Sequence, residues 1–534
     1  MTPGIPLAAV DISAKDFAGM NWVPAAWGLG PALEPNRGAA DRMRHAIQTL
    51  ARDVPRRIIY THTGWRLIGD RWVYLYAGGA VGADDVAVEP GEGLHRYTLT
   101  DTADPAAIAE SLRLLVVARP EVVIPLWAAV YLAPLCEPLR RAGVEPAFVL
   151  WLLGQTGAMK STLAALFLSH FGEFSNKNLP GSFRDTENAL EKRGFLAKDT
   201  LLVIDDYHPV ANPTDAARMR KTAETLLRGY GDRVGRTRMR ADTSIREGYP
   251  PRGLCAVTGE DVPDAGQSTT ARYVAVEVSR SAVDVDMLTR CQAKAHRLPA
   301  AMRGYIEWLA ARLDGLPESL RGRFADLRQR AMVESRHGRM AETVAWLHMG
   351  LETGLDYAVE AGAVNREERD DMLAERWAVL MGLAEAQGRR IEEDRPSERF
   401  CTVLRELLTS GAAYVVDLGT ARPDADDGPA GRMPGFLGWR DRDWCYLLPE
   451  VAYKAVAEFV GRTGGHFPVT SRTLWKHLDA DGLIEPETHG EYRHYARHKK
   501  IEGRNHRLIG LRASAVLPGD NSDGKLAYND SSIG

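Results

Sequence analysis

A glycine-rich turn followed by a lysine and two hydroxyl residues is the clearest chemical pattern in the sequence. It reads GQTGAMKST, follows a short apolar run and precedes a helical pattern. Glycines let backbone N–H groups wrap phosphates, and the N-terminus of a helix favours their negative charge. Lys160 would reach the outer phosphates of a nucleotide, and the Ser161 hydroxyl would bind magnesium. The predicted phosphate-binding residues are Gly154, Gln155, Thr156, Gly157, Ala158, Met159, Lys160, Ser161 and Thr162.

One position departs from the usual pattern of such a loop. The residue before the lysine is usually glycine, and here it is Met159. A bulky side chain limits the turn geometry and could weaken or reshape nucleotide binding. The alternative interpretation of the whole segment is a glycine turn that only joins a strand to a helix.

Two adjacent carboxylates end the next apolar run, LLVIDD, at residues 201–206. A second parallel strand beside the loop strand would deliver both acids to the sheet edge where the loop lies. Asp205 would hold magnesium, directly or through water, and Asp206 would polarise the attacking water as a general base. Alone, the pair could equally cap the next helix. Together with the loop, it favours binding and hydrolysis of ATP.

Two polar residues frame the last two apolar runs of this region. Thr258 follows the run Gly253–Val257 and could sense the γ-phosphate or orient the attacking water. Arg272 precedes the run Tyr273–Val278 and suits an arginine finger that acts on a neighbouring subunit. The alternative for Arg272 is a surface ion pair with an acidic residue.

An arginine-rich segment, GDRVGRTRMRADTSIREG, lies before the third apolar run. Its alternation predicts a hairpin with arginines on one face. Such a hairpin could project into a central channel and follow a DNA backbone, although charge runs are usually solvated faces. The predicted DNA contacts here are Arg233, Arg236, Arg238 and Arg240.

A second basic unit lies near the C-terminus, at residues 436–512. Leu447–Val460 and residues 471–483 predict two helices, and two alternating runs surround Glu502-Gly503. Helix, turn, helix and basic hairpin is the plan of a winged helix, which binds DNA or a protein partner. The predicted DNA contacts here are Arg472, Lys476, Arg497, Lys499 and Lys500.

Short buried runs that alternate with helices predict an α/β fold, a P-loop NTPase core with a parallel sheet. Alternating residues broken by glycines predict β-hairpins at residues 56–100, and residues 104–142 read as helical. The expected domains are an N-terminal module at 1–143, the ATPase core at 144–282, a helical region at 283–421, a winged helix at 436–512 and a disordered tail at 516–534. The segment Pro423–Gly435 reads as a linker.

The composition of the chain limits its possible partners, metal sites and location. The 534 residues carry a net charge of −4, so any nucleic-acid contact must come from local basic patches. Five dispersed cysteines without a CxxC pair argue against a disulfide framework or zinc site and favour a reducing compartment. The apolar run Val122–Leu135 contains two prolines and is short for a membrane span, so we expect a buried helix and a cytoplasmic protein.

Four segments resemble the family called domain of unknown function 927: THTGWRLIGDRWVYLYAGGAVG, GQTGAMKSTLA, LLVIDDYHP and TGEDVP…STTAR. Members are P-loop ATPases often carried by plasmids, phages and integrative elements, and the similarity spans residues 56–282. The order of motifs is also similar to superfamily-three replicative helicases, AAA+-like rings that pull single-stranded DNA with a hairpin. The resemblance implies ATP, magnesium, a hexameric ring and a role in replicating a mobile element.

Carried over by motif, the resemblance assigns a role to individual residues. Thr258 stands where these helicases often have asparagine, so its sensor role is less secure than the others. The remaining matches are Lys160 and Ser161 in the loop, Asp205 and Asp206 as the acids, Arg272 as the finger, and Arg236 and Arg238 in the hairpin.

The function hypothesis is an ATP-dependent DNA translocase or helicase that forms a homo-oligomeric ring and hydrolyses ATP between subunits. Its DNA partner could be single- or double-stranded. The first alternative is a non-translocating P-loop ATPase switch that binds DNA or a partner through the winged helix. The second is a non-hydrolysing scaffold, with Met159 as the sign of lost activity.

Overall fold

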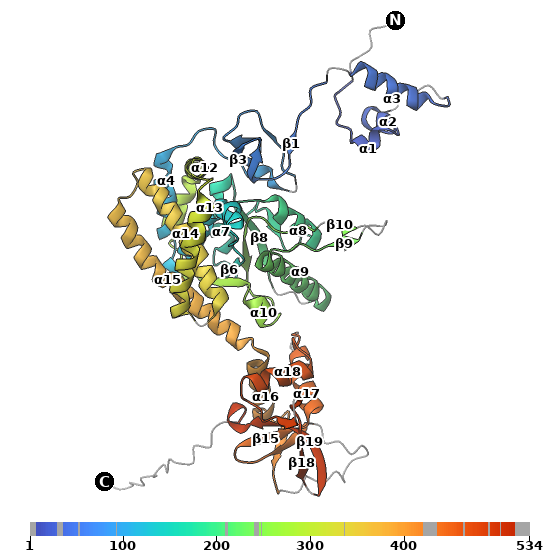
Figure 1. Cartoon of the computed structure of the whole chain (residues 1–534), viewed down its shortest axis with the longest axis vertical. Coiled ribbons are helices and arrows are strands. Elements are labelled where there is room, and N and C mark those ends of the chain that lie inside the picture. Colours follow the sequence, from blue (N-terminus) through green and yellow to red (C-terminus); the bar gives the residue numbers. More distant parts are fainter. Residues whose placement is uncertain are drawn as a thin grey trace, which may run out of the picture. The chain divides into compact units, whose positions relative to one another are not determined.

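The computed structural model (Figure 1) describes residues 7–517, except 29–35, 52–53, 92, 209–211, 240–244, 247, 336, 420–434, 463–464, 490–491 and 502. The chain forms two compact units, Met1–Ile59 and Tyr60–Gly534. The first unit includes helices α1 (Ala14–Phe17), α2 (Trp22–Trp27) and α3 (Ala39–Leu50). The division between the units falls inside the predicted N-terminal module.

The second unit begins with a small antiparallel meander of β2 (Gly64–Ile68), β3 (Arg71–Tyr76) and β4 (Gly79–Val81). Its two turns contain Gly69 and Gly78, whose φ angles of 62° and 92° lie in the region that favours glycine. The β-hairpins predicted from alternation and from these glycines are therefore confirmed.

A five-stranded sheet with the order β12-β6-β11-β8-β7 forms the centre of this unit, and its neighbouring strands pair in parallel. Its strands are β6 (Val149–Leu153), β7 (Gly181–Ser182), β8 (Leu201–Tyr207), β11 (Leu254–Gly259) and β12 (Tyr273–Glu277). The four apolar runs predicted as buried strands are thus β6, β8, β11 and β12. The expected α/β fold with a parallel sheet is confirmed.

The position of the acid-bearing strand differs from the prediction. β8 does not lie directly beside the loop strand β6, because β11 pairs with both and separates them. Val257 of β11 is level with Trp151 on one side and with Ile204 on the other. The carboxyl ends of all three strands still share one edge, so Thr258 lies between the loop and the acids.

Helices cover the sheet and share one hydrophobic core with it and with the meander. Before and around the sheet lie α4 (Ile108–Arg113), α5 (Pro120–Leu132), α6 (Cys136–Arg141), α7 (Lys160–Leu168), α8 (Glu187–Leu196), α9 (Pro213–Asp232) and α10 (Gln267–Thr270). The predicted helical region contains α11 (Val285–Ala293), α12 (Leu298–Ala310), α13 (Leu316–Glu334), α14 (Gly338–Glu360), α15 (Arg366–Glu393) and α16 (Pro396–Thr409). Its expected helical character is confirmed.

The most apolar helical segment, Pro120–Arg141, has the length and composition of a membrane span, and its apolar window is entirely buried within the protein. α5 packs against α14, where Gly350 and Gly354 allow a close approach. A Cβ atom on Gly350 would lie 2.2 Å from the Ala128 carbonyl oxygen. The segment is therefore a core helix in this structure, as the sequence predicts.

The arginine-rich segment forms the predicted hairpin. β9 (Arg238–Met239) pairs antiparallel with β10 (Ile245–Arg246), and Met239 is level with Ile245. The hairpin follows α9 in the chain and lies beside the ends of α8 and α9 (Figure 1). Arg240, one of the predicted DNA contacts, lies outside the described residues.

The C-terminal part of the second unit has its own hydrophobic core. A sheet of order β13-β14-β15-β19-β18 accompanies α16, α17 (Pro449–Arg462) and α18 (Ser471–Ala480). The strands are β13 (Tyr414–Asp417), β14 (Phe436–Arg440), β15 (Trp444–Leu447), β18 (Arg497–Ile501) and β19 (Arg504–Arg512), and a separate hairpin joins β16 (Glu487–His489) to β17 (Tyr492–His494). The predicted two helices and basic hairpin, β18–β19, are present. Most of the predicted linker and tail lies outside the described residues.

Candidate functional site

The turn between β6 and α7 is shaped by the lysine that follows it. The Lys160 ammonium donates to the carbonyl oxygens of Gly154 at 2.6 Å and Gln155 at 2.9 Å. Gly154 cannot carry a side chain, because a Cβ atom there would lie 2.1 Å from the Val278 carbonyl oxygen. Gly157 has a φ of 81°, in the left-handed region. The glycines and the lysine thus fix the path of the loop, and Thr162 follows in the first turn of α7.

Met159 adopts a backbone conformation that glycine normally supplies. Its φ of 68° and ψ of 20° are left-handed, immediately before the first residue of α7. A non-glycine residue pays about 1–2 kcal/mol for this conformation. Met159 therefore adds backbone strain at the position where the loop enters α7.

The predicted magnesium ligands and the polar strand end meet at the carboxyl edge of the sheet. The Ser161 hydroxyl donates to Asp205 Oδ1 at 2.6 Å, and the Thr258 hydroxyl donates to the same oxygen. The backbone N–H of Asp206 donates to Thr258 Oγ1 at 3.3 Å. A carboxylate beside a hydroxyl is the kind of oxygen donor set that magnesium prefers. The structure therefore brings these four residues together beside the loop.

One buried ammonium and three carboxylates set the electrostatics of this edge. Lys160 is 9% exposed, and burial lowers the pKa of its ammonium, although the carboxylates of Glu260, Asp205 and Asp206 act in the opposite direction. A bound polyphosphate would stabilise the charged ammonium and replace the loop carbonyls as its partner.

A cavity of about 940 Å³ adjoins the loop. Its far wall comes from residues that no motif singles out, among them Arg119, Glu121, Ser279 and Arg280. They meet because residue Ala118 forms a bridge with Val283, which joins the chain before α5 to the chain after β12. The cavity is in the size range of small-molecule sites, large enough for the sugar and base of a nucleotide.

Glu260 is another residue that the motif analysis did not assign. It directly follows β11, and its carboxylate accepts a hydrogen bond from the Thr156 hydroxyl of the loop. The only signal for Glu260 in the sequence is its place just after the polar strand end. That signal is weak, because acidic residues commonly follow strands without contacting a loop.

Arg272 lies at the opposite edge of the sheet from the loop. It directly precedes β12, whose carboxyl end is level with Leu153. Its guanidinium donates to both carboxylate oxygens of Asp232, at 3.1 and 2.8 Å, and to Ser268 Oγ at 2.7 Å. The side chain is 12% exposed. Arg272 therefore cannot reach the loop of its own chain, and the ion pair considered as the alternative is present.

Two of the arginines predicted to contact DNA through the hairpin are engaged by other parts of the chain instead. The Arg233 guanidinium donates to the carbonyl oxygens of Pro146 at 2.5 Å and Gly253 at 2.8 Å, and only 10% of its side chain is exposed. Arg233 thus ties the end of α9 to the amino edge of the sheet. The sequence could not show this, because charge patterning does not distinguish a buried arginine from an exposed one.

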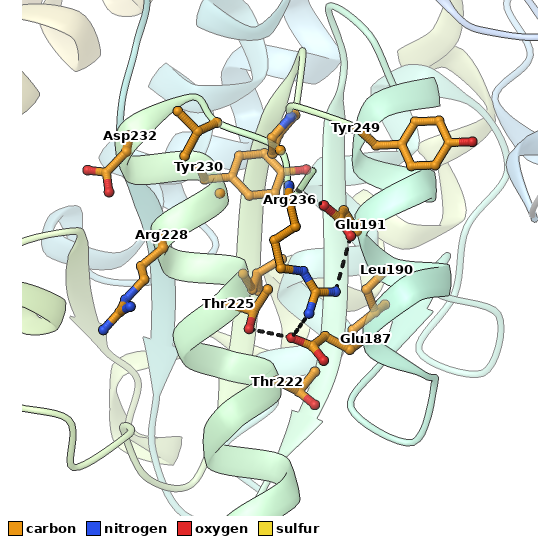
Figure 2. Close-up of a pocket in the computed structure, with 15 residues that line it drawn as sticks. Glu187, Leu190, Glu191, Thr222, Thr225, Arg228, Tyr230, Asp232, Arg236 and Tyr249 are labelled. Atoms are coloured by element: carbon orange, nitrogen blue, oxygen red, sulfur yellow. Dashed lines mark hydrogen bonds and ion pairs between the residues drawn. The ribbon is translucent and has the colours of Figure 1, made fainter. Parts of the chain in front are cut away.

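Arg236 precedes the hairpin and binds α8. Its guanidinium contacts Glu187 at 2.5 Å and Glu191 at 3.1 Å, and Figure 2 shows the side chain pointing between these two carboxylates. Thr225 of α9 also donates to Glu187, at 2.5 Å. Arg236 therefore joins the base of the hairpin to α8 and does not project outward as predicted. The strand of Arg238 is described, whereas its side chain is not.

The predicted basic residues of the C-terminal unit divide between two faces. Arg472 and Lys476 are exposed on α18, and Lys500 is exposed on β18. Arg497 and Lys499 lie against the Tyr446 ring, at 5.3 and 3.4 Å from its centroid. Adjacent residues of a strand point to opposite faces. Arg497 and Lys499 therefore share the face of β18 that lies against the Tyr446 ring, and Lys500 points to the other face.

A groove of about 580 Å³ lies on the α18 side of this unit. Arg472, Arg493 and Arg507 line it together with Trp475. Arg493 is paired with Asp479 at 2.6 Å. Arg493 and Arg507 are not among the contacts predicted from the sequence, because the face that each presents depends on the strand register.

Three solved structures are similar to this chain to different degrees. The active helicase Cch of SCCmec type IV matches with a TM-score of 0.57 and 12% sequence identity, over 89% of this chain and 84% of that chain. The apo NrS-1 C-terminal region gives a TM-score of 0.27 at 10% identity, covering 72% of this chain and 88% of its own. JCV helicase bound to an acetamide compound gives 0.21 at 13% identity, over 46% and 70%.

No family model matches the sequence, and no match is found among curated proteins. The resemblance to domain of unknown function 927 therefore rests on the motifs alone. The likeness to the Cch helicase shows that the chain shares the fold of that protein, with a mixed α/β core and helical regions.

Proposed function

We propose that this chain is an ATP-dependent DNA translocase or helicase of a mobile genetic element. One observation carries the proposal. The Ser161 hydroxyl and the Asp205 carboxylate are 2.6 Å apart, beside a loop whose underside is held by Lys160. A nucleotide triphosphate with magnesium requires this set of groups, which here comes from the first turn of α7 and the carboxyl end of β8.

In the proposed reaction, the loop amides and Lys160 bind the phosphates, and Ser161 and Asp205 hold magnesium. Magnesium would neutralise charge that develops on the phosphates. Asp206 would accept the proton of the attacking water, and Thr258 would keep Asp205 oriented through its hydrogen bond. The adjoining cavity would hold the base and ribose.

We further propose a homo-oligomeric ring in which Arg272 acts on the nucleotide of the neighbouring subunit. Its place at the opposite sheet edge from the loop fits action between subunits only. DNA would contact the hairpin β9–β10, through Arg238 and Arg240, and the C-terminal unit, which we interpret as a winged helix. The exposed residues Arg472, Lys476 and Lys500 would serve there.

A second candidate is a non-translocating ATPase switch, which one observation favours. The Arg272 guanidinium is fully engaged by Asp232 and Ser268 within its own chain. If that ion pair persisted, no finger would act, and the chain would hydrolyse ATP without a motor cycle. Its C-terminal unit would then bind DNA or a partner as a regulator.

The test is phosphate release from ATP, with and without single-stranded DNA, on protein whose mass in solution is measured in parallel. A translocase is expected to form a ring, to be stimulated by DNA and to unwind a forked duplex. The Lys160→Ala variant should lose all of this activity. Hydrolysis by a monomer, unaffected by DNA and without unwinding, would support the switch instead.

A further inference from the structure

The turn between β7 and α8 places an arginine beside the carboxylate proposed as the general base. Ser182 of β7 is level with Asp205 of β8, and the Phe183 N–H donates to the Asp205 carbonyl oxygen at 3.0 Å. The Arg184 guanidinium then lies 3.3 Å from Asp206 Oδ2. No motif in the sequence marks Arg184, because its partner lies on another strand.

This turn is ordered, whereas the arginine side chain that it carries is exposed. The Ser182 N–H donates to Asp185 Oδ2 at 3.2 Å, and the Arg184 N–H donates to Ser182 Oγ at 3.2 Å. Arg193 holds the Asp185 carboxylate at 2.7 Å. The Arg184 side chain is 79% exposed. An ion pair so exposed is weak, so a small movement of the turn can break it.

Arg184 occupies one carboxylate oxygen of Asp206 in this arrangement. Oδ2 accepts a hydrogen bond from the Arg184 guanidinium, whereas His208 Nδ1, 3.3 Å from Oδ1, hydrogen-bonds to the Asp206 backbone carbonyl oxygen at 3.1 Å. The Asp206 backbone has a φ of 73°, a strained conformation for a residue other than glycine. An oxygen that accepts a hydrogen bond from Arg184 is poorly placed to accept a proton from water. Arg184 therefore restrains one oxygen of the proposed general base in this structure.

Helix α8 connects this turn with the hairpin. It begins directly after the turn, with Thr186 as its cap. Further along, Glu187 and Glu191 bind Arg236 at the base of β9–β10 (Figure 2). A displacement of the hairpin would therefore be transmitted to α8 through these two ion pairs, and from α8 to the turn that carries Arg184.

We propose that Arg184 is a positioning residue that restrains Asp206 until DNA binding moves the hairpin and α8. The inference rests on the proposed function, because it assigns the means by which DNA stimulates hydrolysis at the same site. Arg184 does not touch the reacting atoms. Arg184 acts by binding one carboxylate oxygen of Asp206, and it releases that oxygen when α8 shifts.

The first experiment compares Arg184→Ala and Arg184→Lys with the full-length wild type, measuring phosphate release with and without single-stranded DNA. In Arg184→Ala, kcat without DNA should rise about two- to fivefold, as expected for loss of one exposed ion pair, with KM unchanged. The rate with DNA should stay near the wild-type value, so the stimulation ratio approaches one. Arg184→Lys should restore most of the restraint. Arg389→Ala, which removes an exposed ion pair with Glu385 on α15, is the matched control and should change neither rate.

The second experiment tests the connection through α8. A double variant, Glu187→Gln with Glu191→Gln, removes the carboxylates that hold Arg236. It should bind single-stranded DNA with wild-type affinity in fluorescence anisotropy and keep the wild-type rate without DNA. Its stimulation by DNA should fall at least about twofold, the lower bound of the Arg184 effect.

The outcomes separate this inference from the proposed function. If DNA stimulates the wild type and Arg184→Ala has an unchanged or lower rate without DNA, the inference is overturned and the ATPase stands. Full stimulation of the double variant overturns the route through α8. Hydrolysis by the wild type without any DNA stimulation overturns the inference and favours the switch. A wild type that does not hydrolyse ATP overturns both proposals.

Discussion

The two edges of the central parallel sheet use polar residues in opposite ways. At the carboxyl edge, Ser161 and Thr258 both donate to Asp205 next to the loop, and the loop itself lines an open cavity. At the amino edge, Arg233 binds backbone carbonyl oxygens, and Arg272 binds Asp232. The first arrangement leaves groups that a ligand can recruit, whereas the second satisfies them within the fold. Clustered charge therefore indicates a site only where its partners are replaceable.

The largest expected effect concerns the carboxyl edge. Lys160→Ala removes the cation beneath the loop and should lower the rate of ATP hydrolysis at least about a hundredfold, as loss of a group that stabilises developing charge does. Phosphate release measures this effect, and thermal unfolding measures separately the stability lost with the two carbonyl contacts of Lys160. Lys454→Ala, at an exposed position of α17, is the control. Retention of more than a tenth of the activity would show that the two edges do not differ in function.

At the amino edge, we expect an effect on stability instead. Arg233→Ala should lower the free energy of unfolding by about 2–4 kcal/mol, because it leaves the buried carbonyl oxygens of Pro146 and Gly253 without a donor. Urea unfolding of the full chain measures the change. Arg389→Ala should stay within about 0.5 kcal/mol of the wild type. A stable Arg233→Ala protein with weakened DNA binding would restore the role predicted from the sequence.

Asp199 gives the amino edge a pH dependence. Burial raises the pKa of this carboxyl to about 7, although nearby Lys198 opposes the shift. Its folded pKa exceeds the unfolded value, so the folded state binds the additional proton between roughly pH 4 and 7. Through this group, stability should fall as pH rises across that range, by at most about 1.4 kcal/mol per pH unit.

The Asp199→Asn variant cannot lose that proton. It should therefore gain stability relative to the wild type as pH rises from 5 to 8, measured by urea unfolding at each pH. A difference between the two proteins that is constant with pH would contradict this account of the buried carboxyl.

The smallest effect is expected at Met159. Glycine would relieve the left-handed backbone strain at this position but would cost about 0.5–1 kcal/mol in chain entropy. Because the two effects oppose each other, the free energy of unfolding of Met159→Gly should stay close to that of the wild type, and its rate of hydrolysis should stay within about threefold. Met159→Val should do worse than glycine in both assays, since a β-branched residue is a poorer fit to a positive φ. If Met159→Gly instead raised hydrolysis tenfold or more, methionine would be a sign of weakened activity, as the scaffold alternative supposed.

The sequence predicts the strands of the central sheet well, because short apolar runs are typical of buried parallel strands, and the polar residues that follow these runs do meet at the carboxyl edge. It could not show that β11 separates β6 from β8, because strand order depends on long-range packing. It also could not show which arginines turn inward. Arg233 and Arg236 find partners on segments far away in the chain, and Arg497 differs from Lys500 only by the face of one strand.

Calorimetric titration with ATP, in the presence and absence of magnesium, tests the central claim most directly. We expect one magnesium-dependent site per chain in the wild type. Asp205→Asn should weaken binding at least about tenfold in magnesium while the protein remains folded, since a charged ligand of the cation is lost. Equal affinity of the wild type and Asp205→Asn, unaffected by magnesium, would contradict a nucleotide site at the carboxyl edge of this sheet.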